Sequence, residues 1–421
     1  MLGDVKAADL SRICAFFALA YRHMRKKVAI IGARGISNWG GFETAAREIA
    51  PRLVKRGYDV YCSCEKNSCD LDTYEGVKMV YFPLWMPKNY ELRKIFEVLY
   101  DLYFIMHSST ALNCDIVYNL GYNANILMAL PRLLGKKVMF NMAGLEWERS
   151  KFGRVQQFIV KSLFLLASVG ASYIIVDHEK LKPYVPSRYQ DKVVLISYGA
   201  NEPVAVPWNA RAIAEHAGSA EIDDLLAHEY WLVVARLEPD QHIATIVDAY
   251  LRGTSTKPLI VVGDFSSKKY EQAVMEALKD TPSSKKVIMA GGIYDQDVLT
   301  MLRHNCFAYI HGHSKGGTNP SLLEAMIHRN IVIAHDNTFN KGVCEDLALY
   351  FEDGAELQDK MRMIESDPSK YAELKDQVLE RVRAEYTWDK VADQYDVFFQ
   401  QLLRNESESL AAERVGAQTR T

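Results

Sequence analysis

Short apolar runs alternate with amphipathic segments along most of the chain. Residues 27–32 form an apolar run, residues 42–55 repeat apolar side chains with helical spacing, and residues 58–64 form the next apolar run. A buried parallel strand, a helix and a second buried strand account for this order. The pattern therefore predicts a βαβ unit with a Gly-rich loop after its first strand.

The same alternation continues, and it predicts two series of strands. In the first series, further strands are expected at 78–82, 115–121, 137–144, 172–177 and 192–199. After a Pro- and Ala-rich connection, 203–217, a second series is expected at 230–237, 257–265, 286–293, 306–313 and 330–336. Strands that alternate with helices indicate parallel sheets covered on both faces. The predicted fold class is α/β, with two doubly wound Rossmann-like domains that face a central cleft and bind ligands at strand carboxyl ends.

Domain boundaries follow from this division. We expect an N-terminal extension over 1–25, Rossmann-like domains over 26–202 and 203–385, a crossing helix over 386–403 and a flexible tail over 404–421. The tail lacks an apolar stripe, which is why it is not expected to pack on either domain.

Composition narrows the function classes. The 421 residues are 49% hydrophobic and 24% charged, which is typical of a soluble globular enzyme. A net charge of −3 does not favour nucleic acid as a partner. The seven cysteines form no paired framework, so a reducing cytoplasm is expected. Cys62, Cys64 and Cys69 are close in sequence, but no fourth ligand follows at a zinc-binding spacing, and no metal is expected there.

Membrane contact is indicated at a surface rather than through a span. No run approaches the roughly 20 apolar residues that cross a bilayer. In residues 1–25 the cations follow the apolar residues, whereas in a signal peptide they precede them. Two interpretations of this segment stay open: an upstream extension before a natural start near Met24, or a short amphipathic helix at the surface. Segments 86–106 and 152–170 mix cations with broad apolar faces, which fits either a helix at a lipid surface or a buried helix with a solvated edge.

Two Gly-containing loops are candidate phosphate sites. In "NWGGFE" (38–43), Gly40 and Gly41 permit close approach of a ligand to the backbone, and the following helix offers free N–H groups for a diphosphate. A tight βα turn without ligand is the alternative. In "HGHSKGGTNPSLLEAM" (311–326), a glycine-rich loop again leads into a helix that begins at Pro320. This composition is suited to an anionic group, a sugar or both.

Two Asp-x-Asp pairs raise the question of a metal. Asp70 and Asp72 lie in a polar loop, whereas Asp295 and Asp297 lie at a predicted helix N-terminus, where acidic side chains are favoured in any case. We therefore expect neither pair to bind metal.

The blocks "GARGISNWGGFET", "NMAGLEWERSKFG" and "HGHSKGGTNPSLLEA", together with "VARLEPD", resemble GT-B glycosyltransferases of the retaining family 4, and more narrowly their bacterial rhamnosyltransferase branch. The resemblance covers roughly residues 26 to 400. It implies metal-independent transfer of L-rhamnose from dTDP-L-rhamnose, without a further cofactor, to a lipid-linked saccharide in polysaccharide synthesis. It also implies a cytoplasmic enzyme peripheral to the inner face of the membrane.

By this resemblance, residues 203–385 form the donor domain, and the loop that contains Gly40 to Phe42 in the first domain also contacts the donor. The implied donor-binding residues are Gly40, Gly41, Phe42, Arg236, Gly263, Ile293, Tyr294, His311, His313, Gly316, Gly317, Thr318, Asn319, Ser321 and Glu324. Arg236 would neutralise the leaving diphosphate, or form only a surface ion pair. Glu324 would accept hydrogen bonds from ribose hydroxyls. Ile293 and Tyr294 would flank the base or belong to an ordinary turn, and the two histidines would contact the donor or simply pack.

The acceptor side is assigned to residues 26–202. Its implied residues are Glu43, Asn141, Gly144, Trp147, Arg149 and Lys151, and the implied catalytic set is Arg236, Glu324, Ala143 and Glu146.

Three positions depart from the family pattern. Gln241 stands where a lysine is usual, Gly316 where many members have glutamate, and Ala143 where related enzymes have aspartate. At residue 143 a natural variant, a change of acceptor and a deliberate substitution all remain open. The departures keep two other functions in view: a non-catalytic GT-B subunit that binds a sugar nucleotide or glycan, and a GT-B-type sugar-nucleotide epimerase.

Overall fold

The computed structural model describes residues 26–66, 68, 70–122, 127–217, 229–279 and 281–418. The extension predicted over 1–25 lies outside the described residues. The chain divides into two compact units: the first takes the described residues within Met1–Leu120, Ala124–Met139 and Gly170–Ser172, and the second takes those within Gly121–Asn123, Phe140–Val169 and Tyr173–Thr421. The second unit includes chain on both sides of residues 202–203, and the domain boundary expected there stays a prediction.

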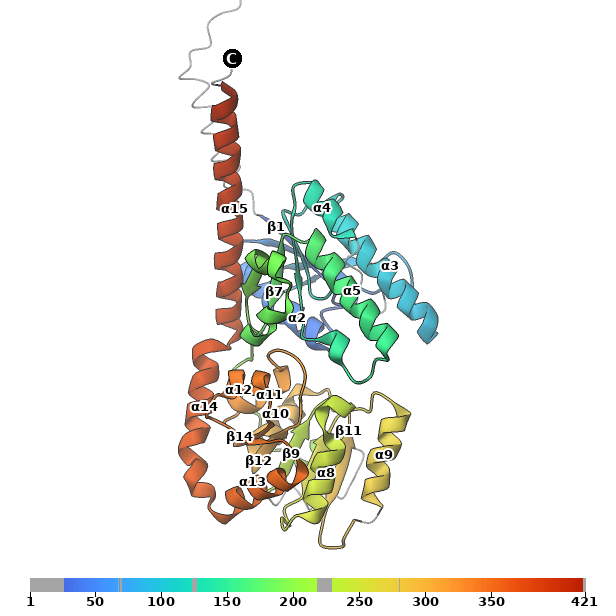
Figure 1. Ribbon diagram of the computed structural model, residues 1–421, viewed down its shortest axis with the longest axis vertical. Coiled ribbons are helices and arrows are strands. Elements are labelled where there is room, and N and C mark those ends of the chain that lie inside the picture. The colour runs from blue at the N-terminus through green and yellow to red at the C-terminus, as the bar shows by residue number, and fades with distance from the viewer. Residues whose placement is uncertain are drawn as a thin grey trace, which may run out of the picture. The chain divides into compact units, whose positions relative to one another are not determined.

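An eight-stranded sheet is built from the first half of the chain, in the order β3-β4-β2-β1-β5-β6-β7-β8. Two of its strands, β1 and β7, are labelled in Figure 1. Its strands are β1 (Lys27–Ile31), β2 (Asp59–Cys64), β3 (Thr73–Tyr74), β4 (Val77–Tyr81), β5 (Ile116–Asn119), β6 (Lys137–Asn141), β7 (Tyr173–Val176) and β8 (Val193–Leu195). β1 pairs in parallel with β2 and with β5. The strand order therefore reverses at β1, as in a doubly wound sheet.

One strand pair in this sheet is antiparallel, which corrects the expectation of purely parallel pairing. β3 and β4 form a hairpin in which Thr73 lies opposite Lys78. The two residues that join them, Glu75 and Gly76, have φ of 44° and 84°. Positive φ at both central positions is the geometry of the tight turns that close two-residue hairpins.

The second sheet has six strands in the order β11-β10-β9-β12-β13-β14. They are β9 (Trp231–Val234), β10 (Leu259–Val262), β11 (Val287–Gly291), β12 (Ala308–His311), β13 (Val332–His335) and β14 (Leu349–Phe351). Every pairing is parallel, and the order reverses between β9 and β12. Every strand predicted from the sequence is confirmed, whereas β3 and β14 were missed because runs of two and three residues give no readable pattern.

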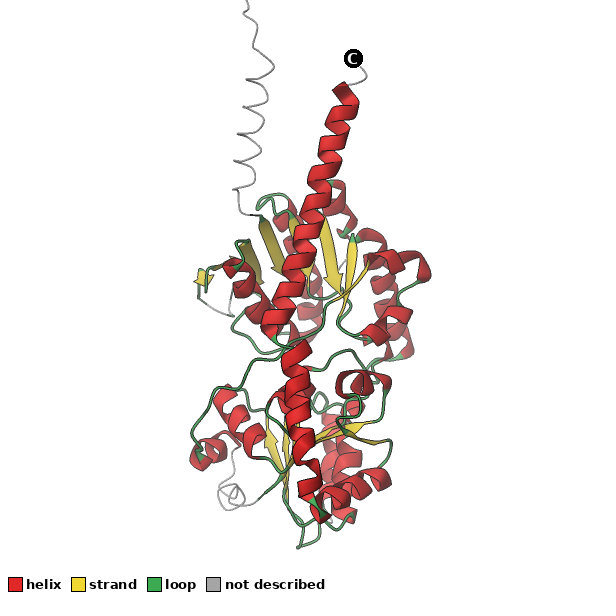
Figure 2. Cartoon of the chain, turned by 90° about the vertical axis from the view of Figure 1, so that its left-hand side faces the viewer, coloured by secondary structure: helices red, strands yellow, loops and turns green. Residues whose placement is uncertain are grey.

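Helices flank the strands of each sheet (Figure 2). In the first half they are α2 (Gly41–Lys55), α3 (Tyr90–Ser109), α4 (Ala129–Leu133) and α5 (Arg154–Gly170). In the second half they are α6 (Ala210–Ala217), α8 (Ile243–Arg252), α9 (Lys268–Leu278), α10 (Gln296–Asn305), α11 (Pro320–Ile327), α12 (Thr338–Cys344), α13 (Gly354–Ser366), α14 (Ala372–Glu385) and α15 (Trp388–Gln418). Among the described helices, none combines the length and apolar composition that a membrane crossing requires.

Alternate residues of the second sheet belong to two different hydrophobic cores. Leu232, Ile260 and Tyr309 are buried on one face, against α10, α11 and α14. Trp231 and Ile310 are buried on the other, against α8 and α13. Because successive side chains of a strand point to opposite faces, continuous apolar runs bury both faces, as the sequence predicted.

Two predicted irregular segments contain helix. Within the connection 203–217, Ala210–Ala217 forms α6 because alanine favours helix, and Ile213 on this helix is buried. The crossing helix expected to end at residue 403 continues as α15 to Gln418, so most of the predicted tail is helical. Extending an existing helix avoids the cost of nucleation, and the Glu- and Ala-rich tail needs no apolar stripe for that. About three turns from its start, α15 contacts β7, with Phe398 against Tyr173 at 5.1 Å between ring centroids.

Candidate active site

The loop after β12 carries five of the fifteen predicted donor residues, and these five lie in the second unit. β12 ends at His311, and α11 begins at Pro320. Asn319 caps α11, because its Oδ1 accepts from the backbone N of Ser321 at 3.0 Å and from the Ser321 hydroxyl at 2.9 Å. Asn319 and Ser321 therefore order this helix start whether or not a ligand is present.

The glycines of the loop are required by close packing. A Cβ on Gly317 would lie 1.7 Å from Oδ1 of Asp177, and Gly316 has φ of 136°. Thr318 donates its hydroxyl to the carbonyl oxygen of Asp177 at 2.6 Å. The loop is thus fixed against the residue that follows β7.

Asp177 is a buried carboxyl that the sequence analysis did not select. Burial raises its pKa to about 7, and its Oδ1 has no hydrogen-bond partner among the described residues. The signal was available, because Asp177 directly follows the apolar run of β7, and polar residues at strand carboxyl ends face ligand sites in such sheets. Gly316 stands where many family members carry glutamate, and Asp177 brings a carboxylate to the neighbouring residue of the loop.

The two loop histidines are buried and neutral. Burial lowers the pKa of His313 to about 3 and that of His311 well below its ordinary value. Nε2 of Gln241 lies 2.6 Å from Nδ1 of His313, so the amide donates and the proton of this ring sits on Nε2, beside Gly316. These rings can form hydrogen bonds, but at neutral pH they bring no positive charge to a diphosphate.

Gln241 has a defined structural role in place of the usual lysine. Its side chain is buried and directed toward His313. Its backbone carbonyl oxygen packs against Gly312, where an added Cβ would lie only 2.0 Å from it. The amide therefore orients a histidine instead of adding a cation beside Arg236.

Arg236 follows β9, as predicted, and its side chain is 62% exposed. Its Nη1 lies 3.5 Å from Oε1 of Glu238, whose side chain is only 4% exposed. The same carboxylate lies 3.4 Å from Nη1 of Arg149 and 3.8 Å from Nζ of Lys151. Glu238 thus links Arg236, which is predicted to contact the donor, to Arg149 and Lys151, which are predicted to contact the acceptor. We call residues 141–151 the acceptor block.

Glu324 pairs with a buried arginine. Its Oε2 accepts from Nη2 of Arg303, a residue that is 3% exposed. Arg303 therefore holds one carboxylate oxygen of Glu324, and a ribose contact with the other oxygen stays a prediction.

The residues predicted to bind the base have partners of their own. Tyr294 donates its hydroxyl to Asp264, and Ile293 is buried in the core of the second sheet. Gly263 has φ of 147° and packs so closely that a Cβ would lie 1.8 Å from the carbonyl oxygen of Ala235. A buried Ile293 favours the alternative of an ordinary turn for that residue.

The block 141–151 contacts the loop 312–319, which is predicted to bind the donor and is called the donor loop below. Ala143 and Gly144 both have left-handed backbone, with φ of 49° and 88°. The backbone N of Ala143 donates to Oδ1 of Asn141 at 2.8 Å, and a Cβ on Gly144 would lie 3.1 Å from Cα of Gly316. The structure therefore brings together the predicted acceptor and donor segments that lie in this unit.

Further along the block, Glu146 and Arg149 form an ion pair of 2.6 Å. The indole of Trp147 is buried against Phe164, with ring centroids 4.9 Å apart. Burial lowers the pKa of Lys151, assisted by the charge of Arg149.

The other Gly-rich loop belongs to the first unit. Gly40 precedes α2 with φ of 154°, and a Cβ there would lie 2.2 Å from a carboxylate oxygen of Glu43. Oε1 of Glu43 accepts from the backbone N of Arg34 at 3.0 Å. The helix start is therefore occupied by a carboxylate of the chain itself, beside Gly41 and Phe42, and the diphosphate contact stays a prediction.

Arg34 also belongs to a buried charged group that sequence reasoning missed. Its Nη1 lies 3.4 Å from Oδ1 of Asp101 and its Nε lies 3.9 Å from Glu65, which in turn accepts from Arg93 at 2.9 Å. Burial raises the pKa of Asp101 to about 6 despite Arg34.

Within the described residues, no three His, Cys, Asp or Glu side chains are grouped so as to hold a metal ion. Asp295 caps α10 by accepting from the backbone N of Asp297 and of Val298, at 2.9 and 3.1 Å. Burial raises the pKa of Cys62 to about 12, and Cys69 lies outside the described residues.

Two family models match the chain. Residues 25–201 match the family described as Domain of unknown function (DUF1972). Residues 226–381 match Glycosyl transferases group 1. The group 1 match contains the whole loop from His311 to Ser321, Arg236 and Glu324, and it supports glycosyltransferase activity. No curated protein sequence matches the chain.

Solved structures share the fold at low sequence identity. Sucrose-phosphate synthase (tll1590) from Thermosynechococcus elongatus gives a TM-score of 0.70 at 17% identity, over 90% of this chain and 100% of that one. Anabaena Alr3699/HepE in complex with UDP-glucose gives 0.68 at 14% identity, over 89% and 99%. Trehalose 6-phosphate synthase from Burkholderia multivorans gives 0.66 at 10% identity, over 92% and 99%. The predicted GT-B fold with two Rossmann-like domains is confirmed.

Proposed function

We propose that this protein is a retaining glycosyltransferase that moves L-rhamnose from dTDP-L-rhamnose to a lipid-linked saccharide in cell-surface polysaccharide synthesis. The observation that carries the proposal is the approach of Gly144 to Gly316, inside a unit that contains the group 1 match. A loop suited to a sugar diphosphate and a block suited to an acceptor lie in contact there. The narrower choice of rhamnose rests on the resemblance of three sequence blocks.

The donor site would use backbone more than side-chain charge. Arg236 supplies an exposed cation, and backbone N–H groups of the loop 316–319 would contact the diphosphate, whereas the first N–H groups of α11 are already bonded to Asn319. Glu324 would accept hydrogen bonds from the ribose through its second oxygen. A nucleotide-sugar partner is consistent with the HepE structure, which holds UDP-glucose.

The transfer would proceed on one face of the sugar. The bond from the anomeric carbon to the diphosphate oxygen breaks, and the acceptor hydroxyl forms its bond on the side from which the diphosphate leaves. The proton of that hydroxyl passes to the departing diphosphate oxygen. Such a route needs no separate protein base, so an alanine at residue 143 is compatible with activity. Arg236 and the loop amides would stabilise the leaving charge.

We further propose that the enzyme works at the cytoplasmic face of the membrane, held peripherally. Support comes from exposed apolar side chains on helices that also carry cations: Ile95 and Leu92, 59% and 51% exposed on α3, and Leu133, 80% exposed on α4. Such faces bind lipid surfaces when cations accompany them.

A panel of nucleotide sugars in a thermal-shift assay tests the donor. We expect dTDP-L-rhamnose to raise the melting temperature more than UDP-glucose or GDP-mannose at equal concentration, since stabilisation grows with ligand affinity. Slow hydrolysis of the bound donor would then separate a transferase from a non-catalytic binding subunit. Dependence of product on an added acceptor would separate it from an epimerase. A preference for another donor would contradict the rhamnosyl assignment while leaving glycosyl transfer intact.

A further inference from the structure

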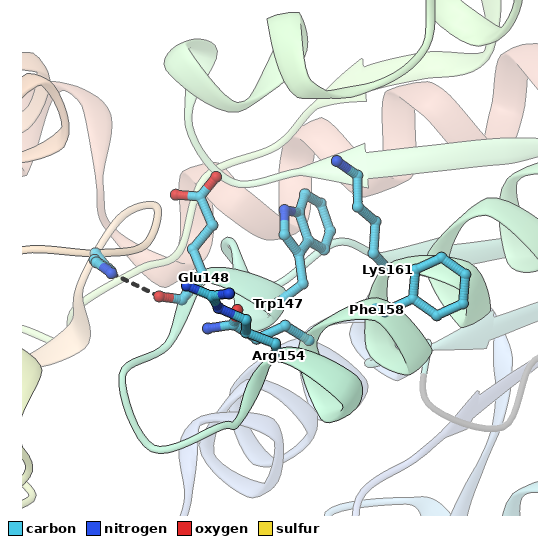
Figure 3. A pocket seen from close by; sticks show the side chains of 7 residues that line it. Trp147, Glu148, Arg154, Phe158 and Lys161 are labelled. Carbon is cyan, nitrogen blue, oxygen red and sulfur yellow. Dashed lines mark hydrogen bonds between the residues drawn. The ribbon is translucent and has the colours of Figure 1, made fainter.

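A basic pocket opens beside the acceptor block, at the start of α5. It has a volume of about 490 Å³ and is lined by Trp147, Glu148, Arg154, Gln157, Phe158, Lys161 and Lys315 (Figure 3). All of these residues belong to the second unit. Four of them share one side of the first two turns of α5, because residues three and four apart lie on the same helix face.

The pocket has an excess of positive charge that the protein does not neutralise. Arg154, Lys161 and Lys315 line it together with a single carboxylate, that of Glu148. In the described part of the chain, no carboxylate forms an ion pair with any of these three cations. Lys315 is held in place instead by a backbone carbonyl, since its Nζ donates to the oxygen of Glu148 at 2.6 Å.

The helix adds to this preference for an anion. α5 begins at Arg154, runs for 17 residues and contains no acidic side chain. The free N–H groups of its first turn carry partial positive charge toward the pocket end of the helix. A group with two or three negative charges, such as a diphosphate, matches three cations and one carboxylate.

An apolar surface leads away from the same pocket. Phe158, which lines the pocket, is 73% exposed, and Val155 and Ile159 beside it are 73% and 50% exposed. Farther along α5, Leu166 and Val169 are 51% and 53% exposed. The spacing 155, 159, 162, 166, 169 forms one stripe, interrupted only by Ser162, over a helix about 25 Å long.

We propose that this pocket binds the diphosphate of an isoprenoid-linked acceptor, with the first part of the isoprenoid chain lying on the apolar stripe of α5. The inference rests on the proposed function and names a contact for its acceptor. A diphosphate bonded to an apolar chain is the chemistry that a basic pocket continuous with an apolar stripe recognises, whereas a soluble saccharide would use neither. The saccharide end would then extend toward Gly144 and the donor loop.

Farnesyl diphosphate serves as a soluble probe in calorimetry. We expect it to bind the full-length protein more tightly than inorganic diphosphate or farnesol does. Inorganic diphosphate lacks the apolar chain, and farnesol lacks the charged group. The double variant Arg154→Gln/Lys161→Gln should weaken farnesyl diphosphate about tenfold to a hundredfold, the loss expected for one or two charge-assisted hydrogen bonds. The double variant Lys268→Gln/Lys269→Gln, with the same charge change on exposed residues of α9, should bind as the wild type does.

A second pair of variants tests the stripe. Phe158→Ser should weaken the binding of farnesyl diphosphate but not that of inorganic diphosphate. Phe158→Leu keeps an apolar side chain and should bind farnesyl diphosphate almost as tightly as the wild type does. Equal binding by wild type and the Arg154/Lys161 variant would overturn the proposal. So would full competition by vesicles of phosphatidylcholine and phosphatidylglycerol, which would show a general anionic lipid surface instead.

Nucleotide binding, measured in the same samples, separates this proposal from the proposed function. We expect the Arg154/Lys161 variant to bind dTDP as the wild type does. Wild type that binds dTDP but not farnesyl diphosphate would overturn the pocket alone. Wild type that binds no nucleotide sugar at all would overturn the proposed function itself.

Discussion

Gly144 packs against Gly316 so closely that a Cβ on Gly144 would lie 3.1 Å from Cα of Gly316 and 3.5 Å from the backbone N of Gly317. Two segments far apart in the sequence thus meet backbone to backbone. Any side chain at residue 144 would press on the loop that we assign to the donor. The contact therefore couples acceptor block and donor loop mechanically, and it can be tested by adding one methyl group.

Gly144→Ala should destabilise the protein and weaken nucleotide binding together. Its φ of 88° costs about 1–2 kcal/mol for a residue with a Cβ, and the contact with Gly316 adds to that cost. Gly135→Ala is the matched control, because Gly135 has φ of 78° but no atom within 4 Å of its added Cβ. We expect similar strain in both variants, but weaker dTDP binding in calorimetry only for Gly144→Ala. Equal nucleotide affinity in the two variants would show that the contact does not support the loop.

Ala143→Asp should raise the rate of transfer while leaving dTDP affinity nearly unchanged. An aspartate there could hold the acceptor hydroxyl by a charge-assisted hydrogen bond, worth roughly 1.5–3 kcal/mol, or about 10- to 150-fold in rate if felt only in the transition state. Aspartate and asparagine also tolerate left-handed backbone better than alanine, and φ of Ala143 is 49°.

Ala143→Asn separates these two effects, because it shares the backbone preference without the charge. We expect a higher melting temperature for both variants and a gain in rate for aspartate alone. A lower melting temperature with no gain in rate would mean that residue 143 only packs behind the loop.

Glu324→Ala should weaken dTDP binding by about 1–3 kcal/mol, the usual cost of losing a charged hydrogen-bond partner. It should also lower stability by about 3–5 kcal/mol, because Arg303 would be left buried and unpaired. Arg303→Met is the complementary variant, since it removes the ion pair but keeps the carboxylate. Calorimetry below the unfolding transition should show weaker binding for Glu324→Ala only. Unchanged affinity in that variant would refute the ribose contact.

Asp177 should make stability fall as pH rises from about 4 to about 7. Its folded pKa of about 7 exceeds the unfolded value near 3.9, so the folded protein binds more protons than the unfolded chain in this window. Above about pH 7 the penalty is constant. Buried His311 and His313, whose pKa values are lowered, act in the opposite sense below about pH 6.5.

A comparison with Asp177→Asn isolates the carboxyl, because the histidines are common to both proteins. The difference in free energy of unfolding, wild type minus variant, should decrease between pH 4 and 7 and then level off in denaturant titrations. Asp72→Asn, on an exposed loop, serves as the control. A flat difference would show that Asp177 is not protonated in the folded state.

Turnover should survive EDTA. The leaving diphosphate is assigned to Arg236 and the loop amides, and Asp295 is engaged as a helix cap. Initial rates measured with EDTA and after readdition of magnesium or manganese should agree within error. A strict requirement for either ion would contradict this account of the leaving group.

Patterns along the chain were sufficient to predict most strands of the two sheets, because the central strands, such as β1, β5, β10 and β12, are buried apolar runs. They also placed Arg236 and His311 near strand ends and Gly316 in the loop before α11. Interactions between side chains far apart in the sequence could not be predicted from these patterns. The residues around Glu324 do not indicate its ion pair with Arg303, and those around Gln241 do not indicate its hydrogen bond with His313. Asp177 was missed because its position after a strand is a weak signal that many aspartates share, and its close approach to Gly317 is visible only in the fold.

The carboxylate of Glu238, shared by Arg149, Lys151 and Arg236, gives the site an internal counter-ion. In the proposed donor site, an incoming diphosphate would compete with this fixed protein anion for the cations. Small free anions such as phosphate gain little from that competition, because they offer no more than the carboxylate already provides. Under the proposed function, the site would therefore favour ligands that span several contacts at once, and salt should weaken their contact with Arg236, whose side chain is 62% exposed.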